Sequence, residues 1–229
     1  MVLILLITLI ILMSIDSFRK LVIPVVISQP LMYDLAFKTR TDFINHYIKD
    51  FLPPIPATIL NFGCGLNLYS DYLVDIGYNV IALDINDVSV SKKIKPIIYD
   101  GVKIPSNLKF DCVIVTTVLH HIPEKTSIDI LKQLKSSNKQ IIIMEDNYSN
   151  LSTPLWCMFT NLQFLNHPLN FKTYHEWKYL FSQYFKIKNT KVDDTVCAFN
   201  LLPLNAPAQT PRGLTNTNNT HYRLTRDPH

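Results

Sequence analysis

The sequence lacks cysteines at metal-binding or redox spacing. Its four cysteines lie far apart, with no C-x-x-C pair and no neighbouring histidines at zinc spacing; they are Cys64, Cys112, Cys157 and Cys197. We therefore expect free thiols that behave as small buried hydrophobes in a reducing compartment, and we predict no metal site.

Charge is also scarce, at 17% of the 229 residues, and the net charge is only +4. The lysines and arginines are scattered rather than clustered with aromatic residues, so no nucleic-acid groove is predicted. With 48% hydrophobic residues, the chain can bury one substantial core. We expect one domain, with extra segments at the two ends.

The first segment is a hydrophobic run from Met1 to Met13, followed by a second run from Leu21 to Ile27. A secretory signal would need a basic region before the run and small residues at a cleavage site, and neither is present. We predict that residues 1–27 form an N-terminal hydrophobic helix that anchors the protein to a membrane, with a signal peptide or an atypical extension as alternatives. The domain would face the cytosol, because the nearest basic residues all follow the run: Arg19, Lys20, Lys38 and Arg40.

At the other end, residues 206–229 are rich in Thr, Asn and Pro and are predicted to be a disordered tail. The three N-x-S/T triplets, at Asn147, Asn150 and Asn218, matter only if the domain lies in a secretory lumen.

A nucleotide-cofactor pattern begins after the apolar run that ends at Phe62. Gly63-Cys64-Gly65 comes first, and Asp84 ends the next apolar run about 20 residues on. Glycine is required where the backbone turns sharply or approaches a ligand closely. A carboxylate at the end of the second strand can accept hydrogen bonds from two ribose hydroxyls. Taken alone, the glycines also fit a tight turn and Asp84 a helix cap.

Further motifs follow in Tyr99-Asp100-Gly101 and in FDCVIVTTVLHHIP, residues 110–123. This order of motifs resembles the class I S-adenosylmethionine-dependent methyltransferases, in particular the small-molecule "type 11" group, over Phe37 to Pro203. The resemblance implies an α/β, Rossmann-like class I methyltransferase fold. It would be a seven-stranded, mostly parallel sheet with helices on both faces, with the N-terminal hydrophobic helix added.

The resemblance also implies S-adenosylmethionine as cofactor and assigns its contacts. Asp84 would bind both ribose hydroxyls, and Asp100 the adenine amine, although Asp100 also fits a simple turn cap. The remaining cofactor-binding positions implied are Asn61, Gly63, Cys64, Gly65, Ile85, Gly101, Thr116 and Thr117.

The candidate catalytic residues are His120, His121 and Asp146. An imidazole can take a proton from a hydroxyl or amine nucleophile near neutral pH. The same two histidines also fit the start of a helix before Pro123. Asp146 and its neighbour Glu145 end the predicted fifth strand, where either could orient a substrate or a base. The acceptor implied is a small or lipid-like molecule.

Two positions depart from the family. Asn61 replaces the acid that usually precedes the glycines, and Asn67 stands where the methyltransferase family has its third glycine. These departures leave open a non-catalytic binding or scaffold protein with the same fold. A nicotinamide-dependent oxidoreductase is disfavoured because Leu68 occupies the third glycine position of G-x-G-x-x-G.

Hydrophobic periodicity places alternating strands and helices along the domain. A helix carrying an apolar stripe is expected at 41–52, a T-x-x-E capping box at Thr173, and an inserted helix at 150–171 that roofs the substrate pocket. The other expected helices are 67–76, 88–94 and 126–135. The expected strands start at 59 and then cover 80–84, 96–100, 111–117, 140–144, 185–190 and 195–202.

Overall fold

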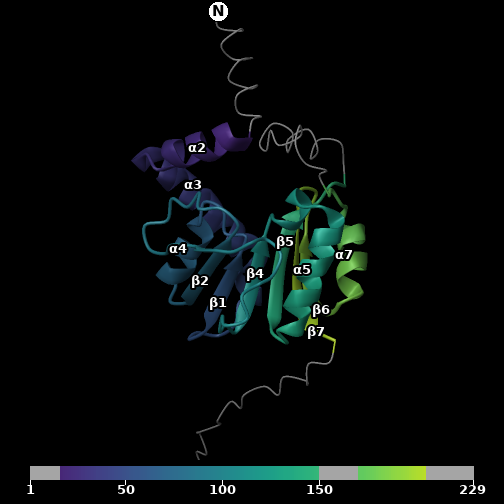
Figure 1. Ribbon diagram of the computed structural model, residues 1–229. Coiled ribbons are helices and arrows are strands. Elements are labelled where there is room, and N and C mark those ends of the chain that lie inside the picture. The colour runs from purple at the N-terminus through teal and green to yellow at the C-terminus, as the bar shows by residue number, and fades with distance from the viewer. Residues whose placement is uncertain (1–15, 150–169, 205–229) are drawn as a thin grey trace, which may run out of the picture.

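The computed structural model describes residues 16–149 and 170–204. Seven strands form one sheet in the order β3-β2-β1-β4-β5-β7-β6 (Figure 1). Only β7, between β5 and β6, runs antiparallel to its neighbours, so the predicted Rossmann-like sheet of seven mostly parallel strands is confirmed. The strands are β1 Thr58–Phe62, β2 Asn79–Asp84, β3 Ile97–Ile98, β4 Cys112–Thr116, β5 Gln140–Asp146, β6 Phe185–Val192 and β7 Val196–Pro203.

The central strands are buried on both faces, as expected for parallel strands covered by helices. Successive side chains alternate between the two faces. In β4, for example, Val113 and Val115 join one hydrophobic cluster, while Cys112 and Ile114 join the other. The alternation of apolar residues along one strand therefore fills two separate cores.

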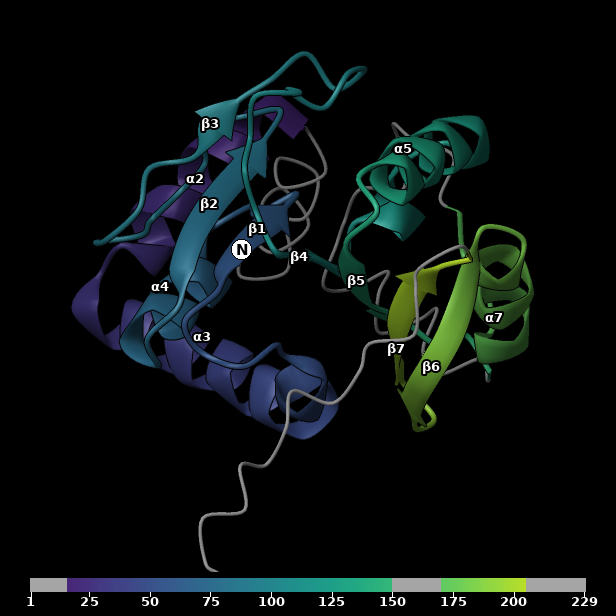
Figure 2. The same cartoon turned by 90° about the horizontal axis from the view of Figure 1, so that it is seen from below.

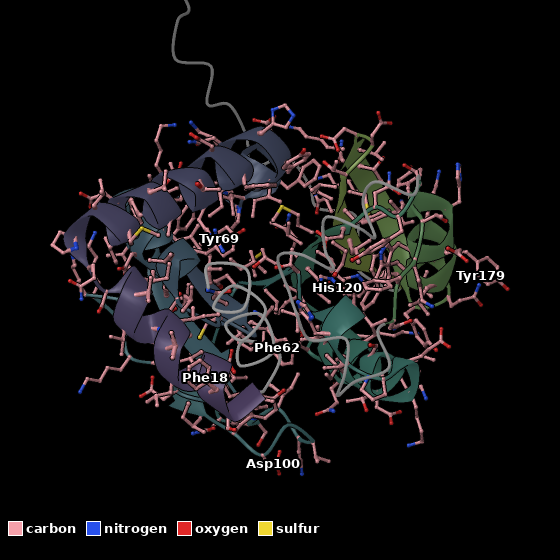
Figure 3. All side chains as sticks on the ribbon, turned by 90° about the horizontal axis from the view of Figure 1, so that it is seen from above. Phe18, Phe62, Tyr69, Asp100, His120 and Tyr179 are labelled. Atoms are coloured by element: carbon pink, nitrogen blue, oxygen red, sulfur yellow. The ribbon has the colours of Figure 1, made fainter. Side chains whose placement is uncertain are left out.

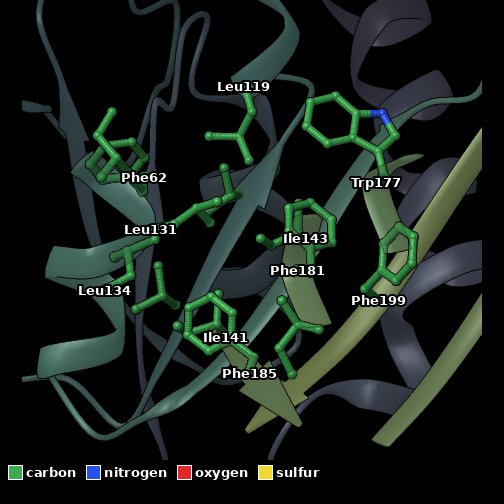
Figure 4. Packing of buried hydrophobic residues seen from close by; sticks show 14 of the residues in the cluster. Phe62, Leu119, Leu131, Leu134, Ile141, Ile143, Trp177, Phe181, Phe185 and Phe199 are labelled. Atoms are coloured by element: carbon green, nitrogen blue, oxygen red, sulfur yellow. The ribbon is translucent and has the colours of Figure 1, made fainter. Parts of the chain in front are cut away.

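Helices α5 (Glu124–Ser136) and α7 (Tyr174–Ser182) cover one face of the sheet (Figure 2). Figure 4 shows their shared core, in which Leu131 and Leu134 of α5 and Trp177 of α7 pack with residues of the sheet. The predicted capping box at the start of α7 is present, because Thr173 and Glu176 each accept a hydrogen bond from the other's backbone N–H.

The other face is covered by α4 (Leu68–Asp75) and by the helix that follows α3. α3 (Pro30–Phe43) passes into a π-helical turn, Ile44–Ile48, and a 3₁₀ turn, Lys49–Phe51. The helix expected at 41–52 thus begins earlier, at a proline in the first helical turn, where no N–H is needed.

The helix predicted at 88–94 is wrong, because the segment is a loop. Serine side chains bond nearby backbone there: Ser89 Oγ accepts from Ser91 N, and Ser91 Oγ accepts from Lys93 N and Ile94 N. Serine favours such local bonds over helix. The expected strand at 96–100 is also reduced to the two residues of β3.

α2 (Asp16–Ile27) precedes α3 at the upper end of the molecule in Figure 1. Among the described helices none alone is long and apolar enough to cross a bilayer, whereas residues 20–27 and 30–51 pass that test together as a pair bent by 96°. Most of the predicted anchor, the predicted roof helix apart from its last two residues, and the predicted tail lie outside the described residues.

Candidate cofactor and catalytic site

A cavity of about 510 Å³ lies at the carboxyl edge of the sheet, where ligands bind in open α/β folds. The loops after β1, β2, β3 and β4 line it, together with residues of α2, α3, α4 and α5. In Figure 3, Phe62 and Tyr69 lie near the middle of this edge and Asp100 at its margin. The predicted site residues that line the cavity are Gly63, Cys64, Gly65, Asp84, Ile85, Gly101, Thr116, Thr117 and His121.

The glycine loop turns back between β1 and the ends of β2 and β4. Gly63 has a φ of +69°, and a Cβ built on it would lie 2.5 Å from Val118 Cγ2. Gly65 also has a positive φ, +52°, but a Cβ there would meet no atom within 4 Å. Gly63 therefore permits close packing against the loop after β4, whereas Gly65 leaves open space beside the cavity.

Asp84 ties this loop to the end of β2. Its Oδ2 accepts a hydrogen bond from Gly65 N at 2.7 Å, and its Oδ1 accepts one from Asn86 N at 3.0 Å. A carboxylate has about four lone-pair sites, so these two bonds leave capacity for ligand hydroxyls. The half-buried Asp84 is thus positioned by backbone amides at the lining of the cavity.

Cys64 also lines the cavity but is buried. Burial and the nearby Asp84 carboxylate raise the pKa of its thiol to about 12. A thiol with such a pKa remains protonated at neutral pH and is a poor nucleophile. Cys64 therefore contributes packing to the loop.

The two asparagines that depart from the family are both buried, and they behave differently. Asn61 is fully buried and lies outside the cavity lining; its Nδ2 donates to Ser70 Oγ of α4 at 2.9 Å. Its Oδ1 is a buried oxygen without a hydrogen-bond partner. Asn67 lines the cavity in left-handed conformation, φ +65°, which asparagine tolerates better than most residues.

Asp100 is exposed and lies outside the cavity lining. Its Oδ1 accepts hydrogen bonds from Val102 N and Lys103 N, which lower the pKa of the carboxyl group. Asp100 therefore caps a turn, which is the alternative to the adenine contact that the family resemblance implies.

The loop after β4 is held in an unusual conformation. Thr117 has a φ of +53°, uncommon for a β-branched residue, and its N–H donates to Met144 O of β5 at 2.7 Å. Such strain persists where surrounding bonds fix it, and it clusters at functional sites. Here it places Thr116, Thr117 and Val118 along the cavity.

The two histidines occupy different environments. His121 lines the cavity, whereas His120 is only 1% exposed and does not line it. His120 Nδ1 lies 2.6 Å from Glu145 Oε2, and its Nε2 lies 3.7 Å from Asp146 Oδ2. The two imidazole rings are in contact, with centroids 3.9 Å apart.

Glu145 is the hub of this arrangement and is fully buried. Its Oε1 accepts from Val118 N at 3.0 Å and from Leu119 N at 2.7 Å, so one carboxylate fixes the loop backbone and His120 together. Burial lowers the pKa of His120. The charge of Glu145, its hydrogen bond and the nearby Asp146 raise the pKa by more than burial lowers it, so the pKa of His120 is raised overall. The two acidic side chains therefore favour the protonated form of the His120 imidazole.

Sequence reasoning missed several lining residues. Two of them are cations, Lys20 of α2 and Arg40 of α3. Another is Tyr69, whose pKa burial raises to about 12, with Arg40 lowering it and Asp146 raising it. In the sequence, these two cations indicate only positive charge after the apolar run. Lys20 and Arg40 reach the cavity because α2 and α3 pack beside it in the fold, and the sequence pattern does not reveal this packing.

The domain matches a known protein family over most of its length. Residues 37–185 match a methyltransferase domain family. The chain belongs to this family. The match confirms the family that the motifs predicted, and it covers the glycine loop, Asp84 and the His120–Glu145 pair of this methyltransferase domain. No curated protein sequence matches the chain.

Solved structures of the same fold include three methyltransferases. The magnesium protoporphyrin IX methyltransferase of Synechocystis PCC 6803, with bound SAH, is 16% identical with a TM-score of 0.54, over 73% of this chain and 83% of that one. Human N-acetylserotonin methyltransferase, in complex with SAM, is 16% identical with a TM-score of 0.57, over 72% and 51%. An Archaeoglobus fulgidus SAM-dependent methyltransferase is 14% identical with a TM-score of 0.54, over 74% and 93%. Two of the three contain SAM or SAH, in agreement with the predicted cofactor.

Proposed function

We propose that this methyltransferase-family protein transfers a methyl group from S-adenosylmethionine to a small or lipophilic acceptor. The observation that carries the proposal is the pairing of Gly65 and Asp84 at one cavity: the glycine leaves an open cradle and the carboxylate lines it, held by backbone amides. The volume of about 510 Å³ lies within the range of about 300–1,000 Å³ typical of small-molecule sites.

The residues around the cavity fit the chemical groups of this cofactor. Asp84 would accept the ribose hydroxyls, and the Thr116–Val118 loop would line the methionine side. Lys20 and Arg40 supply positive charge for a carboxylate on the cofactor or the acceptor. When bound, S-adenosylmethionine supplies the methyl group and its sulfonium leaving group, so the protein mainly aligns the acceptor.

Proton removal from the acceptor falls to His121 in this proposal. Of the two histidines, His121 lines the cavity, and His120 is committed to Glu145. His120 then acts as a positioning residue through its ring contact with His121. Asp146, 18% exposed, stands beside His120 and contributes negative charge to this side of the site.

The second candidate is a methyltransferase-fold protein without activity, and Asn61 is the observation that favours it. A neutral amide at this buried position provides no carboxylate, and its Oδ1 has no partner. A transfer assay separates the two candidates. Full-length protein is incubated with methyl-labelled S-adenosylmethionine and two acceptor pools, polar metabolites and membrane lipids including quinones.

We expect label to move to an acceptor in one pool with wild-type protein and not with Asp84→Ala. Cofactor binding without transfer in either pool would favour the inactive protein instead. Absence of cofactor binding would overturn the proposed function itself.

We further propose that residues 1–27 attach the protein to a membrane with the domain in the cytosol. The apolar run before α2 and the basic residues that follow it support this orientation. Full-length protein should sediment with membranes and resist a high-salt wash, which removes purely electrostatic attachment. Glycosylation of Asn147, Asn150 or Asn218 would contradict the orientation.

A further inference from the structure

Exposed apolar residues of this protein gather on α2 and α3. Six of the fourteen large hydrophobic residues that are exposed in the described part of the chain lie on these two helices, and the most exposed is Leu31, at 79%. Clustered exposed apolar residues mark interaction sites more often than scattered ones do. The six, here called the α2–α3 face, are Leu21, Val25, Val26, Leu31, Met32 and Leu35.

The spacing of these residues follows the helical repeat. Leu21 and Val25 are four residues apart on α2, as are Leu31 and Leu35 on α3, so each pair shares one side of its helix. The opposite side of α3 carries Tyr33, which is buried. α3 therefore has one apolar side packed on the domain and a second apolar side facing outward.

α3 is firmly attached to the domain, so its outward side has a fixed direction. The Tyr33 hydroxyl donates to Asp71 Oδ2 of α4 at 2.5 Å, and the Lys92 ammonium lies 3.9 Å from the centre of the Tyr33 ring. Asp71 is fully buried and also accepts from Lys92 N. A buried, hydrogen-bonded carboxylate of this kind resists displacement.

We propose that the α2–α3 face lies on the surface of a phospholipid bilayer, in the plane of the interface. The apolar run of residues 1–13 leads through only two residues into α2, so a membrane that holds this run is within reach of the face. Helices with one apolar side bind the interface in this way. The proposal rests on the proposed membrane attachment and extends it from the N-terminal segment to the folded domain.

Apolar contact supplies this attachment more than charge does. The exposed lysines of α2 and α3, Lys20 and Lys38, are matched in number by exposed acids of α3, Asp34 and Asp42. Lys38 pairs with Asp42 at 2.6 Å. Vesicles of neutral phosphatidylcholine are therefore a sufficient partner. Docking also has a consequence for the site: Lys20 and Arg40 belong to the same helices and line the cavity, so the cavity would lie next to the lipid headgroups.

The test uses an environment-sensitive fluorophore on single cysteines in the full-length chain. Leu31→Cys and Val25→Cys report on the face, and Tyr179→Cys on α7, 72% exposed, is the matched control on the far flank in Figure 3. Cys157→Ser is included in every variant. The cysteines at 64, 112 and 197 are buried, and burial raises the pKa of their thiols, so they label slowly.

We expect a blue shift of emission, and quenching by acyl-chain nitroxide lipids, at positions 31 and 25 when phosphatidylcholine vesicles are added, and neither change at position 179. If the protein sediments with vesicles while the labels at 31 and 25 remain in water, the N-terminal segment alone is the anchor and the proposal is overturned. A blue shift without vesicles would also overturn it. Concentration dependence would then identify a second copy of the chain on the face, and its absence would identify residues 1–15. None of these readouts depends on methyl transfer.

Discussion

On the β1–β2 side of the cavity, the key polar group is the half-buried carboxylate of Asp84, which lines the cavity. It accepts hydrogen bonds from the backbone N–H groups of Gly65 and Asn86. On the β4–β5 side, the key charged groups are buried and bonded to each other: Glu145 and His120 are 0% and 1% exposed. The first side is built to contact a ligand, and the second is built to hold the loop that contacts it. Mutations on the two sides should therefore separate binding from stability.

The largest effect is expected from Glu145→Gln. The substitution removes the negative charge beside the buried His120. Its amide nitrogen must also face either His120 Nδ1 or the N–H groups of both Val118 and Leu119. Breaking a buried ion pair costs about 3–5 kcal/mol. Urea unfolding measures this free energy.

The matched control for Glu145→Gln is Glu124→Gln. It breaks the pair between the exposed Glu124 and the partly buried Lys172, whose contribution should be only about 0–1 kcal/mol. Equal losses in the two variants would mean that the Glu145 pair does not hold the β4–β5 side together.

Gly65→Ala should act mainly on cofactor binding. Left-handed backbone costs a residue with a Cβ roughly 1–2 kcal/mol, and the new methyl group would also enter the open space beside the cavity. Gly77→Ala is the control, because Gly77 also has a positive φ, +101°, but lies outside the cavity lining. Both variants should lose stability in thermal melts, and only Gly65→Ala should lose affinity in calorimetry. Unchanged affinity in a folded Gly65→Ala protein would show that the open space at Gly65 is not part of the cofactor site.

The His120–Glu145 pair should make stability depend on pH. The pKa of His120 is raised in the folded protein, so its contribution is complete below the ordinary histidine pKa and is lost as the pH rises through the folded value. The difference in unfolding free energy between wild type and His120→Gln should therefore be larger at about pH 6 than at about pH 9. A difference that is constant or grows with pH would show that His120 is neutral in the fold.

The smallest effect is expected from Asp100→Ala. The carboxylate caps a turn through Val102 N and Lys103 N and lies outside the cavity lining. Affinity for S-adenosylmethionine should be unchanged within error. A large loss would instead support the adenine contact that the family resemblance implies.

The sequence predicted the fold well because the central strands each carry an apolar signal. The runs in β1, β4 and β5 are long enough to mark buried strands, and the capping box at Thr173 marks the start of α7. The prediction of a helix at 88–94 was wrong because the two serines in that segment, Ser89 and Ser91, form local side-chain hydrogen bonds that no hydrophobic pattern reveals.

The site was predictable only in part. Gly63 and Gly65 were predictable because their backbone conformation favours glycine, and Asp84 was predictable because it ends the second strand. The different environments of His120 and His121 were not predictable, because neighbouring residues in a motif differ only in what the fold packs against them. Arg40 was missed as a lining residue because it reaches the cavity from a helix that precedes the motifs.

The most direct test of the central claim is calorimetric titration of S-adenosylmethionine into wild type, Asp84→Ala and Asp87→Ala. Asp87 is the matched control, since it is an exposed aspartate of the same loop outside the cavity lining. Hydrogen bonds to a charged group contribute about 1.5–3 kcal/mol each, so Asp84→Ala should weaken binding by about tenfold or more. Wild type and Asp87→Ala should bind alike. Equal affinity in all three folded proteins, or no binding by wild type, would contradict the assignment of this cavity as the cofactor site.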